Sequence, residues 1–200
     1  MFERVTIYAS DLDASERFYD TVLGTVGGGR EDFSLAAATD AQPVTRRLHI
    51  AFFAPSREHV DEFWRAGASA GYRDDGAPGP RPQYREDYYG GFLLDPDGNS
   101  AEAVHHGDTR RRTPGRIDHL WIRVADVAAS TRFYETVAAR TGFRIRPHTP
   151  DRTQIAGEDG SFSVVSGEST EHVHMALPAD EDDMLVDPDG NTVELVRRGR

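Results

Sequence analysis

The chain has 200 residues and a formal net charge of −11, because 34 Asp and Glu residues outnumber 23 Lys and Arg residues. That deficit argues against binding to nucleic acid or to an anionic membrane surface, which both need clustered positive charge. The chain has no cysteine, so disulfides, thiolate metal sites and a cysteine nucleophile are excluded.

No apolar run approaches the ~20 residues that a membrane-spanning helix needs. The N-terminal residues show no basic region followed by an apolar stretch, which is the pattern of a signal peptide. We therefore expect a cytoplasmic protein.

The first half of the chain predicts a strand, a helix and then several further elements. Apolar residues four positions apart, followed by Gly24, predict a helix over 13–23. Ser56 is the expected N-cap of a second helix. The turn Asp-Pro-Asp-Gly-Asn at 95–99 predicts a hairpin. Strands are expected at 5–9, 33–38, 48–53, 92–94 and 101–104.

The second half predicts the same kind of elements, but fewer of them. A helix is expected over 127–139. Strands are expected at 120–124, 162–165, 173–177, 184–186 and 193–196.

Three sequence motifs occur twice, which indicates an internal duplication. The turn at 95–99 recurs at 187–191, and in both copies a Glu follows seven residues after the first Asp. Phe-Tyr occurs at 18–19 and 133–134, and a His follows an apolar residue at 48–49 and 173–174. We predict one domain at 1–107, a linker at 108–113 and a second domain at 114–200. The second domain is expected to lack one helix and loop, because its last two motifs are much closer together.

The opening of the second domain reads Ile-Asp-His-Leu-Trp-Ile-Arg-Val-Ala-Asp at 117–126 and is followed by Phe-Tyr. With the mid-domain Leu-His-Ile-Ala-Phe at 48–52 and the closing Asp-Pro-Asp-Gly-Asn-x-x-Glu, it resembles the vicinal oxygen chelate superfamily. That superfamily includes glyoxalase I, extradiol dioxygenases and bleomycin-resistance proteins. The resemblance implies an α+β fold of paired βαβββ modules that form cupped mixed sheets, here as tandem glyoxalase-like domains with the second one truncated.

The resemblance also implies a divalent metal ion in the cup, held by residues of the first and last strands of the modules. Imidazole and carboxylate ligands suit Fe(II), Mn, Ni, Co or Zn. Residue by residue, the matching positions are Arg4, His49, Glu102, His119, His174 and Glu194.

Two pairings of the modules are possible. Pairing across the halves gives one cup His49, Glu102 and His119, and places Arg4 and the truncation together in the other cup. We favour this pairing because it leaves one site intact. Pairing within the halves instead makes a site of His119, His174 and Glu194 in the second half.

The segment 74–91 is rich in Gly and Pro and has no predicted strand or helix before its end. Loops of this length are often functional, so we expect it to act as a flap over the cup. The candidate substrate-binding residues in it are Tyr84, Arg85, Tyr88 and Tyr89. Related proteins often have His here, where this chain has Gln83, so we assign no catalytic acid or base. His105 and His106 are expected to face solvent.

These patterns leave two functions from different classes open. A metal-dependent enzyme that acts on a small molecule would be dioxygenase-like or lyase-like. The set of two His and one Glu resembles the dioxygenase branch, because a glyoxalase I site needs a second carboxylate as base. The alternative is a metal-free protein that binds an antibiotic or other small molecule, or a pseudoenzyme. The fusion allows a monomer, and a homodimer stays open.

Overall fold

The computed structural model describes residues 1–28, 31–107, 112–147 and 149–199, so most of the expected linker at 108–113 lies outside the described residues. The first half contains β1 (Arg4–Ala9), α1 (Leu12–Leu23), the 3₁₀ turn η1 (Gly24–Val26), β2 (Phe33–Ala37), β3 (His49–Phe53), α2 (Arg57–Ser69), β4 (Arg73–Pro80), β5 (Tyr89–Leu94) and β6 (Ser100–His105). The second half contains β7 (Ile117–Val124), α3 (Val127–Thr141), β8 (Arg144–Ile145), β9 (Arg152–Ala156), β10 (Ser161–Ser166), β11 (His174–Ala179), β12 (Asp183–Val186) and β13 (Thr192–Arg197).

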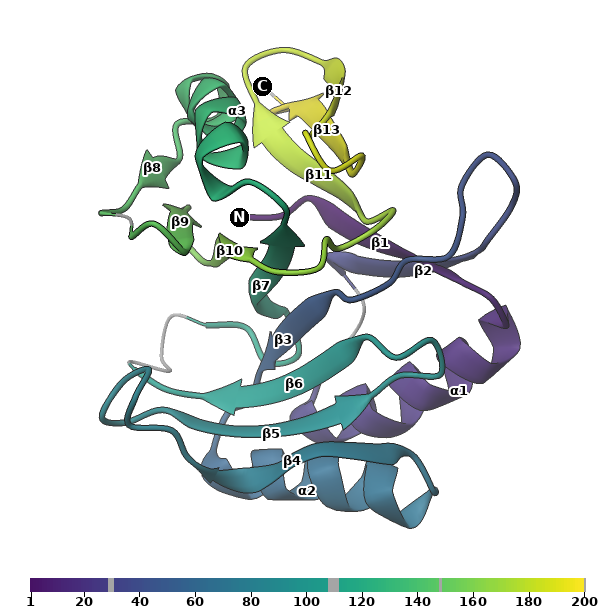
Figure 1. Cartoon of the computed structure of the whole chain (residues 1–200). Helices are drawn as coiled ribbons and strands as arrows, with labels where there is room; N and C mark the ends of the chain where they lie inside the picture. The colour runs from purple at the N-terminus through teal and green to yellow at the C-terminus, as the bar shows by residue number, and fades with distance from the viewer. Residues whose placement is uncertain (29–30, 108–111, 148, 200) are drawn as a thin grey trace.

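The strands form two mixed sheets (Figure 1). The strand order is β4-β5-β6-β3-β7-β10-β9-β8 in the eight-stranded sheet and β12-β13-β11-β1-β2 in the five-stranded sheet. In each sheet an antiparallel pair joins the two halves of the chain, β3 with β7 and β1 with β11. The modules therefore pair across the halves, and the predicted α+β fold with cupped mixed sheets is confirmed.

The two sheets are built from modules of different completeness. The eight-stranded sheet combines two modules that each contain a strand, a helix and three strands, β3-α2-β4-β5-β6 and β7-α3-β8-β9-β10. The five-stranded sheet combines β1-α1-β2 with β11-β12-β13, and within the described residues no helix lies between β11 and β12. Both reduced modules thus belong to the same sheet.

The expectation of a structureless segment over 74–91 is wrong. Its first part is β4, the edge strand of the larger sheet, and only 81–88 is left as a loop. The register of β4 against β5 shifts on either side of Gly76. An irregular edge strand tolerates the Pro and Gly residues that hid it in the sequence, because one side of it needs no ladder hydrogen bonds.

In each half of the chain, the Phe-Tyr motif on a helix is hydrogen-bonded to the Asp-Pro-Asp-Gly-Asn turn. The Tyr19 hydroxyl donates a hydrogen bond to Asp95 at 3.1 Å, and the Tyr134 hydroxyl donates one to Asp187 at 3.0 Å. All four side chains are buried. The Phe-Tyr pair and the Asp-Pro-Asp-Gly-Asn turn therefore stabilise each half.

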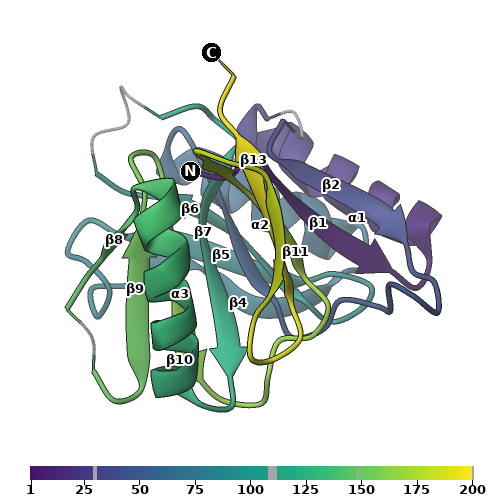
Figure 2. The same cartoon turned by 90° about the horizontal axis from the view of Figure 1, so that it is seen from above.

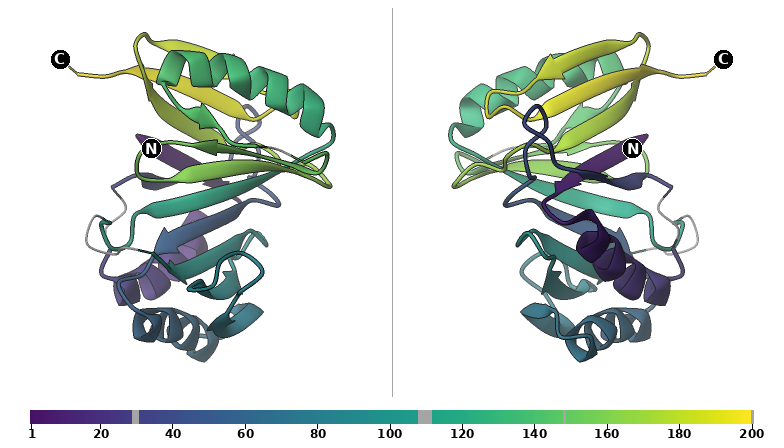
Figure 3. Two further views of the ribbon diagram at one scale, coloured as in Figure 1. Left: turned by 90° about the vertical axis from the view of Figure 1, so that its left-hand side faces the viewer. Right: turned by 90° about the vertical axis from the view of Figure 1, so that its right-hand side faces the viewer.

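One apolar core joins the two sheets. Phe33 of the smaller sheet packs on Phe52 of the larger one with ring centroids 5.4 Å apart, and Phe2 packs on Phe162 at 6.4 Å. Helix α3 packs against β9 and β10 (Figure 2), and α2 and α3 lie at opposite ends of the molecule (Figure 3). Among the described helices none is long and apolar enough to cross a membrane. The core side of the larger sheet is thus covered, and its polar residues gather on the other side.

Candidate metal centre

Three neighbouring strands of the larger sheet bring the preferred candidate ligands together. His119 on β7 and Glu102 on β6 are both in register with Ala51 of β3, and His49 lies two residues before Ala51 on the same face of that strand. One ligand atom from each of His49, Glu102 and His119 lies within 4.8 Å of the others. We call this face of the sheet the eight-stranded cup.

The three side chains meet at one carboxylate oxygen. Nε2 of His49 lies 3.1 Å from Oε2 of Glu102, and Nε2 of His119 lies 3.6 Å from the same oxygen. The other oxygen, Oε1, accepts a hydrogen bond of 2.8 Å from the Tyr88 hydroxyl. Glu102 is only 1% exposed, so these contacts replace water around a buried charge.

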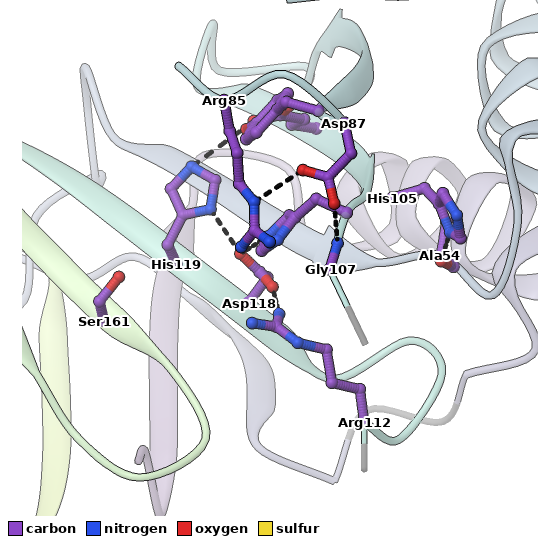
Figure 4. Close-up of polar contacts among 12 residues, drawn as sticks. Ala54, Arg85, Asp87, His105, Gly107, Arg112, Asp118, His119 and Ser161 are labelled. Carbon is purple, nitrogen blue, oxygen red and sulfur yellow. Dashed lines mark hydrogen bonds and ion pairs between the residues drawn. The ribbon is translucent and has the colours of Figure 1, made fainter. Parts of the chain in front are cut away.

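A second layer of polar groups orients both imidazoles. Nδ1 of His49 lies 3.1 Å from the Ser100 hydroxyl, and Nδ1 of His119 lies 2.9 Å from Oδ1 of Asp118 (Figure 4). In the metal-free protein Nε2–H of His49 can donate to Oε2 of Glu102, whereas a proton held on Nδ1 would leave the Nε2 lone pair for a metal ion. A carboxylate behind a His ligand also raises the basicity of the ring, as in many metal sites.

Asp118 reaches this position because of a β-bulge. Residues 51 and 52 of β3 pair with His119 and Ile117 of β7, so Asp118 is the extra residue. A bulge re-aims a side chain that regular alternation would direct to the opposite face. Asp118 also forms an ion pair with Arg112 and contacts Nε2 of His106 at 3.1 Å. The expectation that His106 faces solvent is wrong, because its ring stacks on buried Tyr88.

Burial keeps His119 and His106 neutral. It is the main cause that lowers the pKa of His119; nearby Glu102 raises it in part, and Arg152 and Arg112 add smaller lowering contributions. Burial likewise lowers the pKa of His106 to about 4. Burial and the adjacent carboxylate raise the pKa of Tyr88 far above its usual value. At pH 7 His119 therefore has the neutral form that a metal ion binds, and Tyr88 keeps its proton.

Gly90 makes room for the carboxylate. A Cβ atom at this position would lie 2.3 Å from Oε1 of Glu102 and 3.2 Å from the Tyr88 ring. Any side chain there would displace one of these two groups. The sequence shows only a Gly-Gly pair, and nothing in it marks Gly90 as part of the site.

The cup holds two connected compartments of about 400 Å³ each. His119, Trp121, Tyr84 and Tyr88 line both. One compartment extends over β9 and β10, and the other extends over β3 and β5. The candidate ligands therefore lie where two cavities of small-molecule size meet.

Residues 2–103 match the profile of the Glyoxalase/Bleomycin resistance protein/Dioxygenase superfamily. The chain belongs to this superfamily. Its fold is similar to glyoxalase I from Zea mays, with 18% identity and a TM-score of 0.68 over 98% of this chain and 92% of that one. It is also similar to a putative dioxygenase from Bacillus subtilis, with 11% identity and a TM-score of 0.62 over 100% and 85% of the two chains. A search of curated proteins finds no match.

Within this superfamily cup, the four candidate substrate-binding residues lie in different places. Tyr84 is 47% exposed and meets Trp121 edge to face at 5.6 Å, and Arg85 lines a compartment but is paired with Asp87. Tyr88 is buried against the carboxylate, as described above. Tyr89 points to the other face of β5, where its hydroxyl donates to Asp61 of α2 at 2.8 Å. Strand alternation therefore removes Tyr89 from the cup.

The remaining candidate ligands lie on the five-stranded sheet. We call the face that carries them the five-stranded, or smaller, cup, and the eight-stranded cup is the larger one. Nε2 of His174 lies 2.9 Å from Glu194, and the Tyr8 hydroxyl lies 3.3 Å from Nδ1 of the same ring. Arg4 is exposed and forms no ion pair with Glu194 in the described part of the chain. The second-choice trio of His119, His174 and Glu194 is divided between the two sheets, so it cannot act as one site.

Proposed function

We propose that this protein is a metal-dependent enzyme that acts on a small molecule with two neighbouring oxygen atoms, with dioxygenase-like chemistry. His49, Glu102 and His119 would hold the metal ion. The observation that supports this proposal most is the approach of these three ligand atoms to within 4.8 Å of one another at the junction of two cavities.

The donor set fits a divalent ion of the proposed kind. Two neutral imidazoles and one carboxylate suit Fe(II), Mn, Ni, Co or Zn, and three protein ligands leave coordination positions open. When bound, such an ion acts as a Lewis acid that chelates two oxygens and stabilises the negative charge that develops on them. His119 is held in its neutral form by burial, so no proton has to leave it when an ion binds at pH 7.

The protein's own residues shape the compartments around this centre. Trp121 lies beside both imidazoles, with ring centroids 5.5 Å from His49 and 6.5 Å from His119. Phe92 flanks His49 on another side at 6.0 Å. These rings exclude water from one side of the centre and provide flat walls for a small planar molecule.

The number of carboxylates favours oxidative cleavage over isomerase or lyase chemistry. The group of candidate ligands in the described residues contains one carboxylate, Glu102. Isomerisation at this type of site needs a second one as a base, whereas two His and one carboxylate are the typical ligands of Fe(II) oxygenases. The proposed reaction therefore takes dioxygen as oxidant, breaks the ring C–C bond beside the two hydroxyls of a catechol and places both oxygen atoms in the ring-opened product.

A metal-free binding protein is the second candidate. The specific observation in its favour is that both oxygens of Glu102 already have partners, with Tyr88 at 2.8 Å and His49 at 3.1 Å. The larger cup is complete within one chain, which supports a monomer over a homodimer in either case.

Metal content and oxygen uptake distinguish the two candidates. Protein purified without a His tag is loaded anaerobically with Fe(II) or Mn(II), desalted, analysed for metal and mixed with catechol in an oxygen electrode. We expect about one equivalent of metal and oxygen uptake, and we expect His119→Ala to lose both. His59→Ala, on α2, is the matched control that keeps them.

A metal content below about a tenth of an equivalent after loading would overturn the enzyme proposal and favour the binding protein. Normal metal binding without oxygen uptake, for catechol and for carboxylated catechols, would overturn the dioxygenase assignment but not the metal site.

A further inference from the structure

The compartment over β9 and β10 has a polar floor. Ser161 and Ser163 of β10 and Arg152 and Gln154 of β9 line it, beside Trp121 of β7. Most of the residues that alternate with them are apolar and belong to the core, among them Ile155, Phe162 and Val164. A floor with four neighbouring side chains that can donate hydrogen bonds fits a charged or polar ligand group, because an apolar ligand would leave these groups unpaired.

Arg152 is the dominant group of this floor. Its guanidinium lies 5.1 Å from the centre of the Trp121 ring, and its Nε and Nη2 atoms donate to the Ser163 hydroxyl at 3.2 and 3.1 Å. Ser163 is 1% exposed, so the hydrogen bonds are made at the bottom of the compartment. The stacked, hydrogen-bonded guanidinium is held in one orientation before any ligand arrives.

Arg152 also lacks a carboxylate partner among the residues that the structure describes. Of the three other arginines that line this compartment, two are neutralised locally, Arg85 by Asp87 and Arg112 by Asp118, and the third is Arg146. The chain has 34 acidic residues, and yet no acidic side chain of the described residues pairs with this half-buried cation. Asp118 and Glu158 also line this compartment, but neither pairs with Arg152, so its half-buried guanidinium can pair with an anionic ligand.

We infer that this compartment binds the carboxylate of a small organic anion through Arg152, while two neighbouring oxygens of the same molecule face His49, Glu102 and His119. This inference rests on the proposed function and names its substrate class. The planar guanidinium fork matches a carboxylate in shape as well as charge. Trp121 lies between the two ends of the site, 6.5 Å from the His119 ring and 5.1 Å from the guanidinium.

The test compares two probes that differ only in the carboxylate, catechol and 3,4-dihydroxybenzoate. Binding to Zn(II)-loaded and to metal-free protein is measured by calorimetry under anaerobic conditions. We expect the carboxylated probe to bind Zn(II)-loaded protein about 10- to 100-fold more tightly than catechol, the range expected of one charge-assisted hydrogen-bond pair. Metal-free protein should keep a preference for the carboxylated probe.

Three variants test whether Arg152 causes the preference for the carboxylated probe. Arg152→Gln should remove the preference in both forms of the protein, and Arg152→Lys should restore part of it, because charge is kept and the planar fork is lost. Arg65→Gln, an exposed residue of α2, changes the net charge equally and should change nothing. Zn(II) affinity and thermal melting of each variant show that the fold and the metal centre are intact.

Equal binding of both probes to wild type, or a preference that survives Arg152→Gln, would overturn the inference even if the metal site is real. Failure to bind Zn(II) would instead overturn the proposed function. A carboxylate preference of metal-free protein that depends on Arg152 would then still support the anion-binding compartment.

Discussion

The eight-stranded and five-stranded cups have the same strand register but different chemistry. In the larger cup His119 and Glu102 face each other across Ala51, and in the smaller cup Arg4 and Glu194 are in the same positions across Ala176. The pairing of the strands is thus the same at these positions in both cups, although the side chains differ. A guanidinium in the position of an imidazole cannot donate a lone pair to a metal ion.

The two cups also differ in how far they shield their polar groups. The side chains of His119 and Glu102 are 11% and 1% exposed, whereas those of His174 and Glu194 are 22% and 36% exposed. In the larger cup the segment 81–88 and Tyr88 cover the carboxylate. In the smaller cup only residues 180–182 connect β11 to β12, and this connection is too short to cover the Glu194 carboxylate. A His–Glu contact therefore occurs in both cups, but the one in the larger cup is much better shielded from water.

The largest expected difference between the cups is in metal affinity. Glu102→Gln keeps the shape of the side chain but removes its charge, so it should weaken Mn(II) binding by more than the ~100-fold that loss of an outer-shell partner can cost. Glu194→Gln is the matched change in the other cup and should leave the affinity unchanged. Calorimetric titration of both variants with Mn(II) measures this. Equal losses in both would mean that the metal is bound by neither cup alone.

A smaller difference is expected in the response to acid. Burial lowers the pKa of His106 to about 4, below the ~6.5 of an unfolded His, so the unfolded chain takes up the proton first as pH falls. The stability that depends on neutral His106 is fully present above pH ~6.5 and decreases as pH falls towards ~4, and the total loss is at most about 3 kcal/mol.

Urea unfolding of metal-free protein at pH 7.5 and pH 5 measures this contribution. The difference in unfolding free energy between wild type and His106→Gln should shrink on acidification. The same substitution at His174 in the smaller cup is the control. A difference that stays constant between the two pH values would show that His106 does not titrate in this window.

The sequence predicted the pairing of the modules for a reason that can be checked in the structure. Arg4 and the truncation could be assigned to one cup only if the halves exchange modules, and β3 does pair with β7. The same exchange predicts that His49, Glu102 and His119 lie together, and one ligand atom of each lies within 4.8 Å of the others. Their role as metal ligands stays a prediction.

Other parts of the site could not be predicted, because they depend on register and local irregularity. Asp118 faces the cup only because of the bulge in β7, and alternation alone would have turned it away. Arg152 lies on β9, a short strand without a strong alternating pattern, and its partner Ser163 is on β10. Gly90 matters because of the space that Glu102 occupies, which is a tertiary property.

The smallest expected difference concerns a single hydroxyl in each cup. Tyr88→Phe removes the donor to Oε1 of Glu102 and leaves a buried carboxylate oxygen unpaired, so metal-free protein should lose about 1–3 kcal/mol of unfolding free energy. Tyr8→Phe removes the hydroxyl that contacts His174, but water can replace it in the more open cup, so the loss should stay below about 1 kcal/mol. Urea unfolding of both variants without metal measures the two values. The cost of an unpaired oxygen depends on whether water can reach it. A loss of unfolding free energy for Tyr8→Phe as large as that for Tyr88→Phe would therefore mean that the smaller cup excludes water as well as the larger one does.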